Sequence, residues 1–281
     1  MMTSMHGRTC LITGATSGIG RATALGLGAL GAELVLLCRD RERGEAVVRE
    51  IRAAGGRADL LLADLAVQAE VRRAAAEFLA SGRPVHVLVN NAGVVNLQRR
   101  VTPDGLEATF AVNHLAYFLL TTVLLERLQA SAPARIVNVA SEAHRFAPLD
   151  FDDLQNERRY KAMRVYGQSK LANLLFTLEL ARRLAGSGVT VNSLHPGAVA
   201  TRLGTNNGPW ARALISLLRP FFRSPDAGAA TSIHLASADA VAGVSGRYFA
   251  KCREKTPSRA GQDAAAARRL WAVSEALTSP L

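Results

Sequence analysis

A tyrosine and a lysine stand four residues apart in this sequence, as Tyr166 and Lys170. Side chains with that spacing share one face of a helix, with their Cβ atoms about 5–6 Å apart. An ammonium group so close favours the tyrosinate and lowers the phenol pKa from its free value of about 10. A tyrosine tuned in this way can pass a proton to or from an alcohol oxygen. The pair therefore predicts acid–base chemistry, although Y-x-x-x-K also occurs often by chance.

Two polar residues upstream could complete a catalytic set. Ser141 follows the apolar run 135–139, so we expect its hydroxyl at the end of a buried strand. Asn113 lies among apolar residues in a long helical pattern, although asparagine is a poor residue for a helix interior. A kink and an ordered water at Asn113 would explain its presence, and the alternative is a core amide whose hydrogen bonds are satisfied. The predicted catalytic residues are Asn113, Ser141, Tyr166 and Lys170.

A glycine-rich turn follows the first apolar run, with the order Thr-Gly-Ala-Thr-Ser-Gly-Ile-Gly over residues 13–20. Without side chains, the glycines allow a tight turn and a close approach of the backbone to a pyrophosphate. The helix that follows offers free N–H donors at its N-terminus. Glycines alone also mark ordinary turns, but their position between a strand and a helix favours dinucleotide binding. The residues assigned to this cofactor site are Gly14, Thr16, Ser17, Gly18, Ile19 and Gly20.

The residues after the second apolar run distinguish NADP from NAD. An NAD site usually has an acidic residue there for the ribose 2′-hydroxyl, whereas this chain has Cys38, Arg39 and Asp40. We align Cys38 with the acidic position, so that the Arg39 guanidinium can bind a 2′-phosphate in bidentate fashion. In the alternative, Arg39 only caps a loop and Asp40 binds the ribose. We predict NADP(H) as the cofactor, with NAD(H) less favoured.

Three later strand ends extend the cofactor site. Asp64 can bind the adenine amino group while Leu65 covers the ring, or Asp64 can be the N-cap of the next helix. Small residues after the fourth run let the chain pass close to a ribose or nicotinamide, and asparagine side chains there can connect neighbouring strand ends. His195 is interpreted as structural, and His144 is left open between a loop contact and a substrate contact. The other residues assigned to the cofactor are Asn91, Ala92, Gly93, Pro196, Gly197, Val199 and Thr201.

These residues need a sheet that brings several strand ends together. Short apolar runs alternate with longer amphipathic segments, and continuous runs are typical of parallel strands buried on both faces. The alternation predicts an α/β fold with a Rossmann-type doubly wound parallel sheet of about seven strands, helices on both faces, and a single domain over residues 1–281. Ligands of such sheets lie beyond the carboxyl ends of the strands. The expected strands are 8–13, 33–38, 58–63, 85–89, 135–139, 189–194 and 246–249, and the expected helices are 19–30, 41–54, 67–80, 104–129 and 165–184.

Composition narrows the class of protein. Hydrophobic residues make up 49% of the 281 residues and charged residues 20%, which is typical of globular proteins. The formal net charge of +11 comes mostly from arginines spread along helices, so we expect no nucleic-acid partner. Three scattered cysteines favour a reducing, cytoplasmic location and give no metal-site spacing. No apolar run is long enough for a transmembrane helix, and residues 1–8 do not resemble a signal peptide.

Taken together, the motifs T-G-x-x-x-G-I-G, N-N-A-G, Y-x-x-x-K and the Pro-Gly bend resemble the short-chain dehydrogenase/reductase family over nearly the whole chain. Four segments look like its retinol-dehydrogenase-like branch, which generally prefers NADP(H). These segments are C-R-D at 38–40, S-E-A-H at 141–144, S-K-L-A-N at 169–173 and R-R-L-W at 268–271.

The resemblance implies a role for each catalytic residue. Tyr166 would be the general acid/base, and Lys170 would lower its pKa and hold the nicotinamide ribose. Ser141 would hydrogen-bond the substrate oxygen, and Asn113 would position a water that links Lys170 to solvent. The resemblance also implies a homodimer or homotetramer built through the two long helices, 104–129 and 165–184.

The expected substrate is a lipophilic aldehyde, ketone or alcohol. Segment 204–223 has apolar side chains at roughly helical spacing and predicts a lid over a hydrophobic pocket. A dimer face and a helix on a membrane surface are its alternatives. The insert 146–164, between Ser141 and Tyr166, is expected to form one wall of the substrate mouth. We predict NADP(H)-dependent interconversion of an alcohol and a carbonyl compound, and the alternative from another class is an NADP(H)-sensing regulatory protein without significant turnover.

Overall fold

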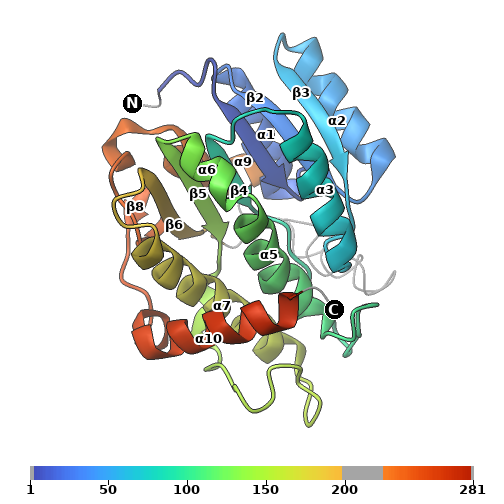
Figure 1. The fold of residues 1–281 in the computed structure, drawn as a ribbon, viewed down its shortest axis with the longest axis vertical. Coiled ribbons are helices and arrows are strands. Elements are labelled where there is room, and N and C mark those ends of the chain that lie inside the picture. Colours follow the sequence, from blue (N-terminus) through green and yellow to red (C-terminus); the bar gives the residue numbers. More distant parts are fainter. Residues whose placement is uncertain (1–2, 198–223, 280–281) are drawn as a thin grey trace.

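The computed structural model describes residues 3–197 and 224–279, and over these residues it has one central sheet of eight strands. The order across the sheet is β3-β2-β1-β4-β5-β6-β7-β8 (Figure 1). Neighbouring strands pair in parallel except for β7 and β8, which pair antiparallel. The strands are β1 (Thr9–Thr13), β2 (Glu33–Cys38), β3 (Arg57–Leu62), β4 (Val87–Asn90), β5 (Ala134–Val139), β6 (Val189–His195), β7 (Tyr248–Ala250) and β8 (Arg253–Glu254).

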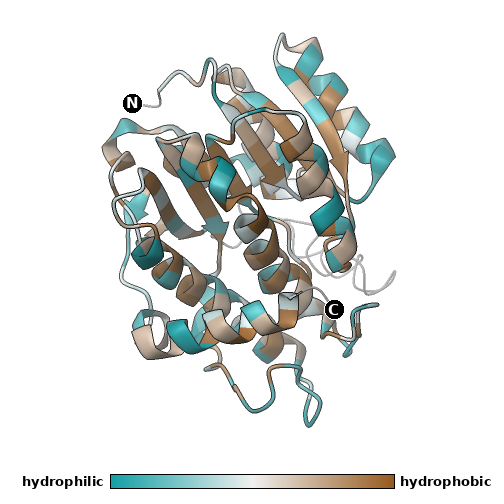
Figure 2. Cartoon of the chain, in the orientation of Figure 1, coloured by the Kyte–Doolittle hydropathy of each residue, from teal (hydrophilic) through white to brown (hydrophobic). Residues whose placement is uncertain are grey.

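Helices cover both faces of the sheet (Figure 1). One face is covered by α1 (Gly18–Ala29), α2 (Arg41–Ala53) and α9 (Pro225–Ser237). The other is covered by α3 (Gln68–Ala80), α5 (Ala116–Val123), α6 (Leu125–Ala130) and α7 (Ala162–Arg183). In β1, Leu11 packs against the helices of the α3, α5 and α7 face, and its neighbour Ile12 packs against those of the α1, α2 and α9 face. Both side chains are fully buried. The central strands therefore bury apolar side chains on both faces, which explains their continuous apolar runs, coloured brown in Figure 2.

The predicted fold class is confirmed, because the sheet order from β3 to β7 is that of a doubly wound Rossmann-type sheet. The expected seventh strand is extended by the short hairpin strand β8. The order reverses between β1 and β4, so the carboxyl ends of these two strands form the crevice in which such sheets bind ligands.

The prediction of one continuous helix over 104–129 is wrong. Helix begins at Ala108, because the Glu107 carboxylate caps it by accepting hydrogen bonds from the backbone N–H groups of Thr109 (2.9 Å) and Phe110 (2.7 Å). A short α4 (Ala108–Phe110) then passes into a π-helical turn, η1 (Ala111–Leu115), which contains Asn113. Asn113 therefore lies where the regular α-helical pattern changes to a π-helical turn.

The helices α9 and α10 (Ala264–Thr278) were not predicted, although both begin with strong capping residues. Ser224 accepts a hydrogen bond from Ala227 N before Pro225, and Asp263 accepts from the first turn of α10. Helix α10 lies across α5 and α7 (Figure 1). No helix in the described part of the chain is both long and apolar enough to span a bilayer.

Trp271 anchors α10 on those two helices. Its ring centroid lies 4.9 Å from that of Phe118 on α5 and 6.0 Å from that of Phe176 on α7. The Arg183 guanidinium lies 4.0 Å from the Trp271 ring centroid, and Ser274 Oγ lies 2.9 Å from His114 Nε2. Helices α5 and α7, which were expected to form a subunit interface, are therefore packed against α10 of the same chain.

Candidate active site

The glycine turn after β1 has the backbone shape that a phosphate cradle requires. Gly14 and Gly18 have φ values of +70° and +54°, which residues with side chains rarely adopt. A Cβ atom at Gly20 would overlap the Gly14 carbonyl oxygen and Asn91 Nδ2. Helix α1 begins after Ser17, which forms no side-chain cap, so the amide groups of the first turn are available to an anion. The residues at this end of β1 therefore fit a dinucleotide pyrophosphate.

The ends of β1 and β4 are held together by hydrogen bonds. Thr13 Oγ1 accepts from the backbone N–H groups of Asn91 (2.9 Å) and Ala92 (3.0 Å), and Asn91 Nδ2 donates to the Thr13 carbonyl (2.9 Å). Asn90 Nδ2 donates to Asn138 Oδ1 on β5 (2.9 Å). The expectation that asparagines connect neighbouring strand ends is confirmed. The small residues Ala92 and Gly93 lie directly beside this junction.

Arg39 and Asp40 have different environments at the end of β2. Asp40 is the N-cap of α2, where its Oδ1 accepts from Arg43 N (3.1 Å). The Arg39 side chain is 71% exposed, and its Nη1 lies 3.5 Å from Asp64 Oδ2. Since Asp40 is committed to the helix cap, Arg39 is the better placed of the two to bind a ribose substituent.

The alternative for Asp64 as a helix N-cap is wrong, because the N-cap of α3 is Val67. Asp64 instead closes the turn before it, with Oδ1 accepting from Ala66 N (2.9 Å), and remains partly exposed. Leu65 packs at the edge of the core under α3.

Asn113 is fully buried, and every polar group of its side chain is paired. Its Oδ1 accepts from Val94 N (2.8 Å), and its Nδ2 donates to the Val94 carbonyl (3.0 Å) and Ser169 Oγ (3.0 Å). Its backbone carbonyl accepts from Asn173 Nδ2 (2.9 Å). The alternative of a satisfied core amide therefore describes this side chain. It connects η1, the N-N-A-G strand end and α7.

Ser141, Tyr166 and Lys170 converge at the ends of β5 and α7. Ser141 Oγ accepts from Ala143 N (3.2 Å) and is hydrogen-bonded to the Tyr166 phenol. A Cβ atom at Gly167 would lie 2.6 Å from the Ala143 carbonyl oxygen, so glycine is what lets the Ser141 loop reach α7 beside Tyr166. Lys170 Nζ donates to the Val139 carbonyl (3.0 Å) and lies 5.7 Å from the Tyr166 ring centroid.

The Tyr166 pKa lies above its ordinary value, contrary to the lowering that was expected from Lys170. Burial raises the pKa of Tyr166 to about 12, against a smaller lowering by the hydrogen bond with Ser141. Burial also lowers the pKa of Lys170 to about 7, so its ammonium form is itself disfavoured. An amine that is partly neutral at pH 7 exerts little pull on the phenol.

The two histidines near the site have structural partners. His195 Nδ1 accepts from Glu142 N and Gly197 N, each at 3.4 Å, which agrees with its structural interpretation. His144 is buried, and its Nδ1 lies 2.7 Å from the Ser141 carbonyl oxygen, so it is a loop contact. Pro196 and Gly197 follow β6 directly. Val199, Thr201 and the segment 204–223 lie outside the described residues.

Apolar side chains lie beside Tyr166. Tyr166 packs with buried Val95 and Ala143. In the described chain, the large apolar side chains that remain exposed are Leu97 (41%), Val101 (52%), Phe146 (61%) and Met163 (52%). Met163 lies one turn before Tyr166 on α7, and the Phe146 Cβ atom lies against Gly167. The insert 146–164 is fixed to the segment after β4 by Tyr160, whose hydroxyl donates to the Asn96 carbonyl (2.8 Å).

Several residues that support the site were not predicted. Tyr117 donates its hydroxyl proton to the Ala92 carbonyl (2.7 Å), and its ring centroid lies 5.7 Å from Lys170 Nζ. Asn173 carries the hydrogen bond to the backbone of Asn113. Helical spacing was the available signal, because Tyr117 follows Asn113 by four residues and Asn173 follows Lys170 by three.

Known proteins share this architecture. The short chain dehydrogenase family matches residues 8–212. Retinol dehydrogenase 14 from Homo sapiens is 46% identical over 295 residues, which cover 99% of this chain and 88% of that protein. The crystal structure of an uncharacterized protein from Mycobacterium paratuberculosis is 36% identical, with a TM-score of 0.81 and coverage of 100% of this chain and 97% of that one. A short chain dehydrogenase from Burkholderia cenocepacia J2315, crystallised in complex with NADP, is 29% identical, with a TM-score of 0.70 and coverage of 88% and 97%.

Proposed function

This chain belongs to the short-chain dehydrogenase family and is an oxidoreductase of CH–OH groups, and on that basis we propose that it uses NADP(H) and acts on a lipophilic alcohol or carbonyl compound. The cofactor choice is supported by Asp40, whose carboxylate is used as the α2 cap and leaves the Arg39 guanidinium exposed. The NADP bound by the related Burkholderia dehydrogenase is consistent with it.

One observation carries the substrate class. Exposed Phe146 and Met163, whose burial in a ligand contact would be favourable, lie next to the buried apolar contacts of Tyr166. A hydrophobic carbonyl compound would cover these side chains while its oxygen reached the Tyr166 hydroxyl. The human relative is named a retinol dehydrogenase, and retinol is a lipophilic alcohol.

The protein groups would divide the proton chemistry between them. When bound, the nicotinamide supplies or accepts the hydride. Because burial holds the pKa of Tyr166 at about 12, its hydroxyl is protonated at neutral pH and can donate to the carbonyl oxygen during reduction. Ser141 would hydrogen-bond the same oxygen. Lys170, with a pKa of about 7, can take up or release a proton at neutral pH, and its charged form would favour the tyrosinate needed for oxidation.

The cofactor proposal is tested by titrating the protein with NADPH and NADH while following cofactor fluorescence. Arg39→Ala should weaken NADPH binding by about tenfold or more, because a charge-assisted hydrogen bond to a phosphate is lost, and should leave NADH binding unchanged. Arg41→Ala is the matched control, since Arg41 is similarly exposed and pairs only weakly with Glu45 at 3.5 Å. Tighter binding of NADH than of NADPH by the unaltered protein would refute the proposal.

The substrate proposal is tested with a series of straight-chain aldehydes and NADPH. The value of kcat/KM should rise with chain length, because each buried methylene contributes about 0.8 kcal/mol. Met163→Ser should flatten this rise while leaving the shortest aldehydes unaffected, so the short substrates serve as the control. A preference of the unaltered enzyme for short polar carbonyl compounds would exclude a lipophilic substrate.

A further inference from the structure

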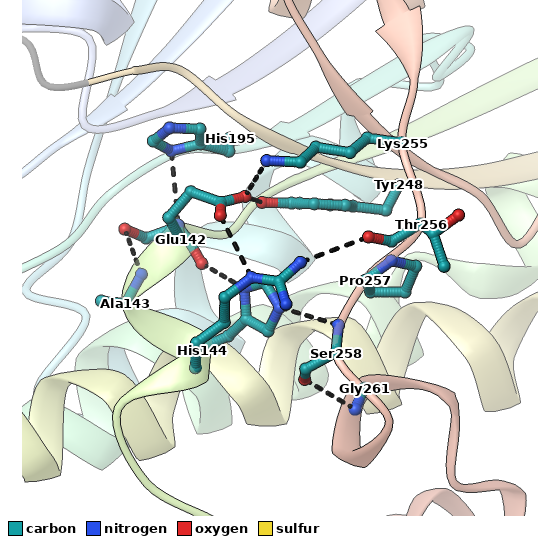
Figure 3. Close-up of polar contacts among 12 residues, drawn as sticks. Glu142, Ala143, His144, His195, Tyr248, Lys255, Thr256, Pro257, Ser258 and Gly261 are labelled. Atoms are coloured by element: carbon teal, nitrogen blue, oxygen red, sulfur yellow. Dashed lines mark hydrogen bonds and ion pairs between the residues drawn. The ribbon is translucent and has the colours of Figure 1, made fainter.

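We propose that Glu142 and His144 are positioning residues that hold Ser141 beside Tyr166 by binding the loop Ser141–Arg145 to the C-terminal clasp, residues 255–261. Figure 3 shows the contacts between these two segments. This inference rests on the proposed function only in treating Ser141 as the residue that contacts the substrate oxygen.

Glu142 is the centre of the polar contacts. Its Oε1 accepts hydrogen bonds from the Tyr248 hydroxyl (2.7 Å) and from Lys255 Nζ (3.0 Å), and its Oε2 accepts from Arg145 Nε (3.2 Å). Burial alone would raise the pKa of Glu142, but these three donors together hold it down at about 2. The carboxylate therefore stays ionised and joins β7 and the clasp to the residue directly after Ser141.

His144 connects the clasp to the Ser141 backbone itself. Its Nε2 accepts from Ser258 N (3.2 Å), so the ring proton must be on Nδ1, which then donates to the Ser141 carbonyl (2.7 Å). The ring also packs edge-on against Tyr248, with centroids 5.4 Å apart. Arg145 adds a third connection, because its Nη2 donates to the Thr256 carbonyl (3.3 Å).

The clasp is itself fixed on the helix that carries Tyr166 and Lys170. Gly261 lies close enough to α7 that a Cβ atom there would be 3.2 Å from Leu174 Cδ1, and its N–H donates to Ser258 Oγ (3.2 Å). On the other side of the loop, the Ala143 carbonyl meets α7 at Gly167. The Ser141 loop is thus held between α7 and a segment anchored on α7. Small displacements of a catalytic group are costly, so this arrangement bears directly on turnover.

The test compares four variants of the full-length protein loaded with NADPH. Glu142→Gln removes the charge, Lys255→Ala removes one exposed partner, and Lys255→Arg restores a cationic donor. Glu254→Gln is the matched control, because that neighbouring carboxylate is 54% exposed and, among the described residues, forms its ion pair with Arg247 (3.6 Å) rather than with the Ser141 loop. For each variant, kcat and KM are measured with an aldehyde that the unaltered enzyme reduces. NADPH affinity, melting temperature and hydrogen exchange of the amides of residues 142–146 complete the set.

We expect Glu142→Gln to lower kcat by about tenfold or more, with NADPH affinity within about twofold of the unaltered protein. Amide exchange in residues 142–146 should accelerate in the same variant. Lys255→Ala should lower kcat and accelerate amide exchange to a smaller extent. Lys255→Arg should have kcat and exchange rates close to those of the unaltered protein, and so should Glu254→Gln.

A merely structural role predicts a different pattern. If Glu142→Gln lowers the melting temperature but leaves kcat per folded molecule and the loop exchange rates unchanged, the positioning role is wrong. If Lys255→Ala and Lys255→Arg behave alike, the charge pair does not hold the loop. If the unaltered protein reduces none of the carbonyl compounds, the proposed function fails, and the exchange rates alone then decide whether Glu142 fixes the loop.

Discussion

Lys170 is an amine buried against neutral partners. Its Nζ donates to a backbone carbonyl, and it faces the aromatic rings of Tyr117 and Tyr166. Taking an ammonium group out of water without a carboxylate beside it costs free energy, and the fall of its pKa to about 7 expresses that cost. Lys170, to which we assign a role in the proton chemistry, therefore destabilises the fold.

This gives a pH dependence of stability with a definite sign. The folded pKa of Lys170 is about 7, below its unfolded value of about 10.4. Between these values the unfolded chain binds the extra proton, so the penalty from burying Lys170 shrinks and stability rises with pH, by up to about 1.4 kcal/mol per pH unit. Below pH 7 the full penalty of the buried charge applies.

We therefore expect Lys170→Met to raise the free energy of unfolding at pH 7 while abolishing turnover. The difference from the unaltered protein should shrink as the pH rises from 7 to 10, which urea unfolding at several pH values measures. Other titratable groups contribute equally to the free energy of unfolding of the variant and of the unaltered protein, so their contributions cancel when the two values are subtracted. A difference that is constant over this range would show that the Lys170 pKa is not depressed.

At this scale the sequence predicted which side chains lie together, but not their pKa shifts. The residue types and spacing of Tyr166, Lys170 and Ser141 were enough to predict that they meet, and they do. The direction of the pKa shifts depends on burial, and therefore on two features: the packing of Val95 and Ala143 on Tyr166, and the position of the Tyr117 ring beside Lys170. Neither feature is visible in a four-residue spacing.

At the scale of elements, the contact between the Ser141 loop and α7 depends on one missing side chain. Gly167 follows Tyr166, and the Ala143 carbonyl oxygen occupies the space that a Cβ atom would need. Helical residues other than glycine are more favourable in isolation, so this glycine lowers the intrinsic stability of α7. The close approach it permits brings the loop to the tyrosine.

We expect Gly167→Ala to displace the loop, with a loss of about 1–3 kcal/mol in unfolding free energy and a larger relative loss of kcat than of NADPH affinity. Gly243→Ala is the matched control, because a Cβ atom there meets nothing within 4 Å. Thermal unfolding and steady-state kinetics measure both effects. Equal behaviour of the two variants would mean that the backbone yields at Gly167 without consequence for Ser141.

The helices and strands with the clearest hydrophobic patterns were the ones whose bounds were predicted best. Strand β2 and helix α2 were predicted to within a residue, since continuous apolar runs and a charged amphipathic pattern are unambiguous. The break at residues 104–107 was missed because the cap is a buried glutamate, Glu107, rather than a serine or aspartate. Helix α10 was missed because its first turn is four alanines, which give no periodic signal.

At the scale of the whole molecule, α10 covers the outer face of α5 and α7. The aromatic contacts of Trp271 with Phe118 and Phe176 make this cover part of the main core. We therefore predict that these two helices do not form a subunit interface and that the protein has a molecular mass near 29.9 kDa in solution. Light scattering during size-exclusion chromatography measures the mass. A stable dimer of the unaltered protein would contradict the predicted mass.

Trp271→Ala should remove about 3–5 kcal/mol of stability, because a large aromatic group is lost from a closed core. The matched control on the same helix is Arg268→Ala, at an exposed position. If the cover prevents association, Trp271→Ala should also increase self-association at high protein concentration. Chemical unfolding and light scattering of the two variants give both answers.

The clasp and the covering helix α10 are one continuous stretch of chain, from residue 255 to residue 278. A supporting surface supplied by another subunit is present only at the concentration of the protein. A supporting surface attached to the same chain has a fixed effective concentration, which for short connections is on the order of millimolar. Turnover per molecule should therefore be the same at nanomolar and micromolar enzyme, so dilution alone should never inactivate it.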